Sequence, residues 1–271
     1  MQYDVKENGK FKYVAEGNGE VILLLHGLFG AMSNFEYLID HFRQKYTVVV
    51  PMLPLYELDL FNTTVGGLAA HLHKFIELMG YSRMHILGNS LGGHVGLVHT
   101  LKHPEKVASL ILTGSSGLYE HGMGDTYPKR GNYEYIKTKT EQTFYNPNHA
   151  TKELVDEVYD IVNSRLKAIR IISLAKSAIR NNIGKELHKI KCPTLLIWGN
   201  QDTITPPFVG AEFQKHIPHA QLEYIDQCGH APMMEQPQAF NALMSTFLQD
   251  VMKQLPQPTA TNTISNIEVK E

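Results

Sequence analysis

About one third of the way along the chain, eight residues read Ile86-Leu87-Gly88-Asn89-Ser90-Leu91-Gly92-Gly93. The apolar start is typical of a buried strand, and the run that follows is typical of a helix. Between them lies G-x-S-x-G, a pattern that forms a tight strand-to-helix turn and exposes its serine hydroxyl. Glycines two positions before and after Ser90 remove side chains that would collide in this turn. The sequence therefore predicts Ser90 as a nucleophile, with the backbone N–H of Leu91 donating to a developing oxyanion.

The composition narrows the classes of protein to which the chain can belong. Its 271 residues are 43% apolar and 19% charged, with a formal net charge of -2. This length suits one large α/β domain with an insertion. Near neutrality argues against a nucleic-acid partner or an anionic membrane surface, and no apolar run is long enough to span a membrane. Without a signal segment or a disulfide framework, we expect a cytoplasmic protein whose Cys192 and Cys228 are reduced thiols.

Apolar runs alternate with helix-like segments on both sides of the Ser90 turn. Alternation around Asn8-Gly9 predicts a hairpin. Short apolar runs with turn residues at their ends predict buried strands, and these lie at residues 21–25, 46–50, 86–89, 108–113, 193–199 and 220–225. Helices are expected at residues 33–42, 64–79, 93–103 and 237–253. The predicted fold class is therefore α/β, with a doubly wound, mostly parallel sheet.

The rhythm of strands and helices stops between residues 117 and 183. Apolar residues recur there at helical spacing in two segments, 154–162 and 166–179, and no strand is convincing. Because the segment is longer than one crossover connection needs, we predict a helical cap at 117–183, inserted into a core of residues 1–116 and 184–254. Ordinary crossover helices are the alternative. The Pro-, Thr- and Asn-rich residues 255–271 are expected to be a disordered tail.

Two further strand ends carry residues that complete the chemistry of Ser90. Asp202 follows the strand at 193–199, and His230 follows the strand at 220–225. A serine hydroxyl is a poor nucleophile near neutral pH, so it needs an adjacent base. We predict that His230 takes its proton and that Asp202 orients the imidazole and stabilises the imidazolium.

A Gly-rich turn follows the strand at 21–25 and reads His26-Gly27-Leu28-Phe29-Gly30. Such a turn aims backbone N–H groups into the crevice at the carboxyl end of the sheet. We predict the second oxyanion donor to be the N–H of Leu28, with Phe29 as the alternative. His26 is interpreted as a residue that orders this turn rather than as a catalytic group.

From residue 3 to about residue 251, the chain resembles the α/β-hydrolase superfamily. The motifs that carry the resemblance are the turn at 26–30, the elbow at 88–93, Trp198-Gly199-Asn200-Gln201-Asp202 and Gly229-His230-Ala231-Pro232. The resemblance implies a hydrolase with a Ser-Asp-His triad in that chain order. It implies no cofactor and no metal. His71 and His73 are interpreted as a poor metal pair, because residues two apart face different sides of a helix.

The Gly-Asn-Ser-x-Gly-Gly elbow is similar to that of meta-cleavage product hydrolases, which cleave a carbon–carbon bond in dienoate ring-fission products. By this resemblance Asn34 and Asn89 would hydrogen-bond the dienolate, and a cap arginine would bind the substrate carboxylate. Arg165 is the first candidate for that arginine, ahead of Arg170 and Arg180. The resemblance implies a small-molecule substrate and leaves a homo-oligomer open.

The sequence departs from the dienoate hydrolases at three places. Ala231 follows the candidate catalytic histidine where an aromatic residue is common, the loop after residue 50 lacks the usual Asp-x-x-Gly-x-Gly-x-Ser pattern, and the turn at 26–30 lacks a run of glycines. Two alternatives therefore stay open. One is a carboxylesterase or thioesterase that uses the same triad, and the other is a small-molecule receptor on this fold.

Overall fold

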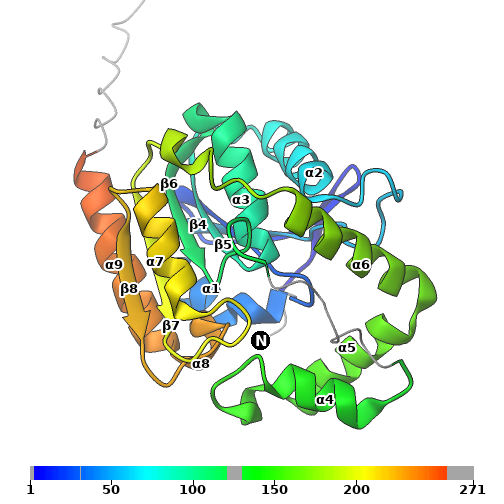
Figure 1. Ribbon diagram of the computed structural model, residues 1–271. Helices are drawn as coiled ribbons and strands as arrows, with labels where there is room; N and C mark the ends of the chain where they lie inside the picture. Colours follow the sequence, from blue (N-terminus) through cyan, green and yellow to red (C-terminus); the bar gives the residue numbers. More distant parts are fainter. Residues whose placement is uncertain (1–2, 31, 121–129, 255–271) are drawn as a thin grey trace, which may run out of the picture.

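The computed structural model describes residues 3–30, 32–120 and 130–254. Within these ranges eight strands form one sheet in the order β1-β2-β4-β3-β5-β6-β7-β8 (Figure 1). Strands β3 to β8 run parallel to one another, whereas β2 is antiparallel to both β1 and β4. The strands are β1 Lys6–Asn8, β2 Phe11–Glu16, β3 Glu20–Leu25, β4 Tyr46–Pro51, β5 Met84–Asn89, β6 Val107–Thr113, β7 Thr194–Gly199 and β8 Gln221–Ile225.

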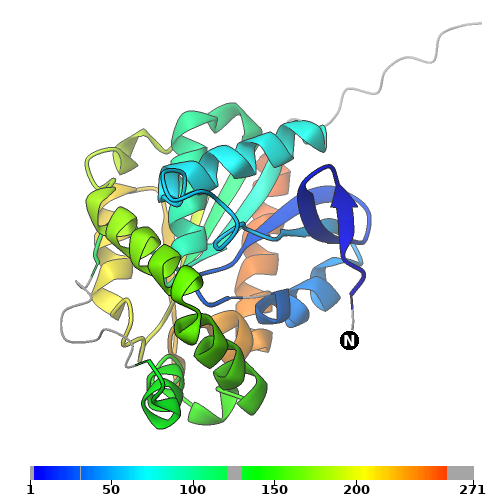
Figure 2. The same ribbon diagram turned by 90° about the vertical axis from the view of Figure 1, so that its right-hand side faces the viewer.

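Helices cover both faces of the sheet (Figures 1 and 2). One face packs against α2 (Val65–Leu78), α3 (Leu91–Lys102) and α7 (Pro207–His216). The opposite face packs against α1 (Glu36–Phe42) and α9 (Pro237–Gln254). Every residue of β5, β6 and β7 is buried, as expected for parallel strands that are covered on both sides. The predicted doubly wound, mostly parallel sheet is confirmed.

Local signals in the sequence set several of these boundaries. Asn8 pairs with Phe11 across the first hairpin, and Gly9 has a φ of 59°, which glycine adopts at little cost. Helix α2 begins where the Thr64 side chain accepts a hydrogen bond from the N–H of Gly67 at 3.0 Å. A short 3-10 helix, η1 (Met32–Phe35), precedes α1 and completes the helical segment expected at residues 33–42.

Between β6 and β7 the described residues form three α-helices: α4 (Tyr133–Glu141), α5 (Lys152–Asn163) and α6 (Arg165–Arg180). The described residues of the segment 117–183 contain no strand. Figures 1 and 2 show α4 and α5 beyond the carboxyl ends of the parallel strands. Helix α4 was not expected from the sequence, and residues 121–129 and the tail 255–271 lie outside the described residues.

An apolar contact joins this helical segment to the turn after β3. Ile136 of α4 and Val158 and Val162 of α5 form a small buried cluster, against which Phe29 packs. Amphipathic α5 buries its apolar stripe in this way and leaves its charged side outward. Within the described part of the chain, no helix is both long enough and apolar enough to cross a membrane.

Candidate active site

Ser90 lies at the tip of the turn between β5 and α3 with a φ of 55° and a ψ of -123°. A positive φ is uncommon for a residue with a side chain, so the surrounding structure must hold it. The N–H of Ser90 donates to the Thr113 carbonyl at 3.1 Å, and its carbonyl accepts from the N–H groups of His94 and Ser116, each at 3.2 Å. A Cβ at Gly92 would lie 2.1 Å from the Leu25 carbonyl oxygen, so only glycine fits there. This is the conformation that the G-x-S-x-G pattern predicts.

The turn after β3 lies directly against Ser90. A Cβ built on Gly27 would lie 3.0 Å from the Ser90 Cβ and 3.5 Å from its Oγ. His26 fixes this turn, because its Nδ1 donates to the Gly27 carbonyl at 2.9 Å and its Nε2 accepts from the N–H of Leu53 at 3.3 Å. Burial lowers the pKa of His26, so the ring stays neutral in this arrangement. His26 therefore orders the turn, as interpreted from the sequence.

Asp202 and His230 form a buried pair. The His230 Nδ1 lies 2.9 Å from the Asp202 Oδ2, and the two residues are 6% and 3% exposed. Burial alone would raise the pKa of Asp202, but His230 and the hydrogen bonds from Thr205 outweigh it and lower the pKa below its usual value. Asp202 is therefore a carboxylate near neutral pH. It holds the proton of the neutral imidazole on Nδ1 and leaves Nε2 as the basic nitrogen.

The elbow and the His230 loop are joined through Asn89. The Asn89 side-chain nitrogen donates to the carbonyl oxygens of Thr113 and His230, both at 3.1 Å. Because Asn89 directly precedes Ser90 and is only 4% exposed, these bonds fix the backbone of His230 relative to the elbow. Both donors of the Asn89 amide are thus used within the protein.

Comparisons with known proteins identify the family of this chain. A family model described as the alpha/beta hydrolase family matches residues 22–243. The chain belongs to the alpha/beta hydrolase family. Its sheet order, its strained serine and its buried Asp-His pair are the features expected of this fold.

Three similar proteins illustrate the range of the family. A solved structure of an alpha/beta hydrolase enzyme from the sediment metagenome of the Mar Chica lagoon, Morocco, is 42% identical, with a TM-score of 0.76, over 91% of this chain and 98% of that one. A 2-hydroxy-6-oxononadienedioate/2-hydroxy-6-oxononatrienedioate hydrolase from Pseudomonas sp is 26% identical over 89% of this chain and 92% of its own. Lipase 1 from Psychrobacter immobilis is 27% identical over 83% of this chain and 76% of its own.

The other residues implied by the resemblance lie in different surroundings in this alpha/beta hydrolase. Asn34, in η1, has its Nδ2 3.2 Å from the position of a Cβ built on Gly30, so it lies beside the turn after β3. Arg165 is exposed at the first position of α6, and Arg180 is exposed at the last. Arg170 is half-buried, and its Nε donates to the Leu58 carbonyl at 3.0 Å.

Two residues that sequence reasoning missed support the Asp-His pair. The hydroxyl of Thr205 donates to the Asp202 Oδ2 at 2.8 Å and lies 3.3 Å from the His230 Nδ1. Its backbone N–H donates to the Asp202 Oδ1 at 2.9 Å. A threonine three residues after an aspartate is a common turn pattern, which is the only signal that the sequence offers.

Glu235, in the one-turn helix α8 (Pro232–Glu235), supports the loop that carries His230. Its two carboxylate oxygens accept from the N–H groups of Gly229 at 2.8 Å and Tyr145 at 2.7 Å. The N–H of His230 itself donates to the Thr143 carbonyl at 2.9 Å. The segment after α4 therefore holds the backbone of the His230 loop. No local sequence pattern predicts this long-range contact.

Proposed function

We propose that this protein is a serine-nucleophile hydrolase in which Ser90, His230 and Asp202 form the catalytic triad. The observation that carries the proposal is the strained backbone of Ser90, at a φ of 55°, beside a buried Asp202–His230 pair whose Nδ1–Oδ2 distance is 2.9 Å. Strain at a residue that bears a hydroxyl persists where the surroundings enforce it, and such sites are often functional. The Asn89 bond to the His230 carbonyl supports a fixed distance between nucleophile and base.

The reaction proceeds in two halves. The Nε2 of His230 takes the Ser90 proton while Oγ bonds to the substrate carbonyl carbon, and the carbonyl oxygen becomes an oxyanion. The backbone N–H groups of Leu91 and of Leu28 or Phe29 stabilise it. When the oxyanion collapses, the bond to the leaving group breaks, and the imidazolium gives its proton to that group. Water then repeats the sequence on the acyl-serine, releasing the acid and restoring Ser90.

The helices α4 to α6 form the cap in this proposal, and the cap supplies the substrate pocket. The cluster of Ile136, Val158 and Val162 packs on Phe29, one of the candidate oxyanion residues. These buried side chains and the half-buried Phe29 make the surroundings of the oxyanion turn apolar, which favours a substrate with an apolar acyl group. A carboxylic ester is the first candidate, because an ester needs no cation beside the nucleophile. The exposure of Arg165 and Arg180 and the bond from Arg170 to Leu58 favour that choice.

Cleavage of the carbon–carbon bond of a dienoate is the second candidate. It is favoured by the resemblance of the elbow and by relatives whose names describe that activity. The same triad would serve, with the proton of His230 passed to the carbon leaving group. This reaction needs a cation for the substrate carboxylate, and Arg165 is the residue to test.

The deciding experiment measures the hydrolysis of an aryl ester and of a 2-hydroxy-6-oxo-dienoate by the wild-type chain, Ser90→Ala and Arg165→Gln. We expect Ser90→Ala to lower kcat by three or more orders of magnitude, since the nucleophile is removed. Arg165→Gln should leave ester hydrolysis unchanged, and Arg180→Gln, at the other end of α6, is its matched control.

Each outcome assigns the substrate differently. If the wild type cleaves the dienoate fast, and KM for it rises at least tenfold in Arg165→Gln but not in Arg180→Gln, the ester assignment would be refuted in favour of the dienoate. If the protein binds a ligand without turnover, and binds it equally well in wild type and Ser90→Ala, the proposal of an enzyme would be refuted and a receptor indicated.

A further inference from the structure

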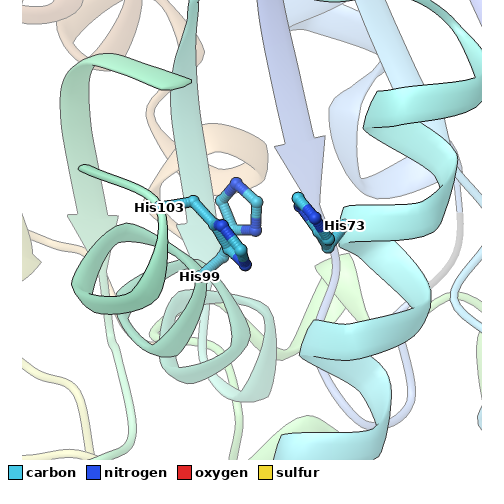
Figure 3. A group of neighbouring side chains, drawn as sticks. All are labelled: His73, His99 and His103. Carbon is cyan, nitrogen blue, oxygen red and sulfur yellow. The ribbon is translucent and has the colours of Figure 1, made fainter. Parts of the chain in front are cut away.

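Three histidines gather between α2 and α3 (Figure 3). His73 comes from α2, whereas His99 and His103 come from the last turn of α3 and the residue that caps it. One ring nitrogen from each lies within 4.8 Å of the others. Helix α3 starts beside Ser90, so at a rise of about 1.5 Å per residue His99 and His103 lie about 12–18 Å along the helix axis from the elbow.

Two of these three histidines carry buried ring nitrogens without a hydrogen-bond partner among the described residues. His99 is 1% exposed, and neither its Nδ1 nor its Nε2 bonds to any described residue. The buried Nδ1 of His73 is also without such a partner. Buried polar atoms are nearly always paired, because an unpaired one loses its hydration without compensation. His73 and His99 therefore each offer an unpaired nitrogen beside the ring of His103, whose Nδ1 lies 4.0 Å from a Glu105 carboxylate oxygen, and this arrangement indicates a common ligand.

The positions of the three side chains suit a chelating site. His99 and His103 are four residues apart, which places their rings on one side of the helix end. His73 faces them from the neighbouring helix. Its ring is stacked on that of His103, with centroids 3.7 Å apart and planes at 5°. Parallel rings cannot direct their lone pairs at one point, so binding requires one ring to turn about its Cβ–Cγ bond.

Space for this rotation is present. A cavity of about 170 Å³ adjoins the three rings and is also lined by Ala69, Ala70, Lys74 and Lys102. Both His73 and His103 are half-buried rather than fully enclosed. The side chain of Glu77, one turn after His73, is paired with Lys106 at 2.6 Å, so its negative charge is already balanced and the histidine rings would be the ligands.

We propose that His73, His99 and His103 bind one divalent transition-metal ion of the zinc class. Imidazole nitrogen is a preferred ligand of Zn²⁺, Co²⁺, Ni²⁺ and Cu²⁺, whereas Mg²⁺ and Ca²⁺ require oxygen ligands. Three nitrogens at about 2.0–2.1 Å with water in the fourth position would complete a tetrahedral zinc site. Because the ion would join α2 to α3 far from Ser90, its effect is on stability and not on the hydrolytic step.

The test is a titration of the full-length protein, stripped with a chelator, with Co²⁺ at pH 7.5. We expect one equivalent to produce the visible absorption of tetrahedral cobalt, without the thiolate charge-transfer band that Cys192 or Cys228 would add. Zn²⁺ should displace the cobalt and, at about 100-fold above its Kd, raise the Tm by about 5–10 °C, whereas Mg²⁺ should have no effect.

Variants locate the site. His103→Gln alters a half-exposed side chain with little risk to folding, and it should weaken cobalt binding at least tenfold. His99→Gln should do the same, with circular dichroism to show that it folds. His71→Gln, on α2 but outside the group, is the matched control and should bind as wild type. Absence of one-equivalent binding by the wild type, or equal binding in His103→Gln and His71→Gln, would overturn the proposal.

Discussion

Thr205 is the residue whose replacement best tests the proposed triad without removing any of its members. Its hydroxyl bonds to Asp202 at 2.8 Å and approaches the His230 Nδ1 at 3.3 Å, so it fixes the carboxylate against the ring. Thr205→Val keeps the shape of the side chain and removes this donor. We expect kcat to fall about tenfold with little change in KM, because a positioning contact is lost and no substrate contact is.

The control is Thr203→Val on the same loop, where the hydroxyl donates to the Gln142 carbonyl and not to the triad. The pH profile of kcat/KM adds a readout that a purely structural role would not move. Its acidic limb should shift in Thr205→Val, since the partner of His230 has lost a hydrogen bond. Identical kcat values and profiles in the two variants would refute a positioning role for Thr205.

The residues of the site differ in how far sequence alone could predict them. Ser90, Asp202 and His230 stand at strand ends, within patterns whose chemistry restricts the residue type, so they could be identified as candidates. Thr205 and Glu235 act through hydrogen bonds that form only after the chain has folded. The group of His73, His99 and His103 was missed for the same reason, because the pairing of α2 with α3 is not visible in the sequence.

At the scale of elements, the contact between α8 and the segment after α4 joins the proposed cap to the loop of His230. Glu235 carries it by accepting from the N–H groups of Gly229 and Tyr145. Glu235→Gln would turn one acceptor oxygen into a donor that faces an N–H group. We expect unfolding free energy to fall by about 1–3 kcal/mol and kcat to fall, as the loop loses one fixed point.

Urea unfolding and ester hydrolysis of the same preparations measure both effects. Glu223→Gln, on the exposed side of β8, is a suitable control, since it changes the charge equally and is outside this contact. If Glu235→Gln matches this control in both stability and rate, the contact does not support the loop.

The elements themselves were predictable where the local signal was strong. The strands around Ser90 are short apolar runs that both layers of helices bury, and α2 starts at a capping threonine. Helix α4 was missed because it is mostly polar and buries only Ile136 and Thr140. Tertiary packing against α5 and Phe29 holds this helix in place. Because so few of its residues are buried, its sequence has little apolar periodicity to detect.

For the molecule as a whole, buried histidines make stability depend on pH. Burial lowers the pKa of His71, His94 and His99 to about 4 each, below the value of about 6.5 expected in the unfolded chain. Between these two values the unfolded state binds protons that the folded state does not. Stability that is fully present above about pH 6.5 is therefore lost progressively as the pH falls toward 4.

His94 offers the cleanest measurement of this effect. It is fully buried in α3, and its Nε2 donates to the Asn181 carbonyl at 2.9 Å, an interaction that a glutamine amide can replace. A pKa difference of this size corresponds to about 3 kcal/mol at pH 4. In His94→Gln the loss of unfolding free energy between pH 7 and pH 4 should be smaller than in wild type by about that amount.

The informative quantity is the difference in unfolding free energy between variant and wild type at each pH, because other groups titrate in the same pH range. Burial raises the pKa of Glu120 and Glu235, which take up protons in the folded state and oppose the trend set by the histidines. These contributions cancel when the two unfolding curves are subtracted at each pH. His188→Gln, at an exposed position, should follow the wild-type curve throughout. If His94→Gln also runs parallel to wild type from pH 7 to pH 4, proton binding at His94 does not govern acid stability, and the loss must come from the remaining buried groups.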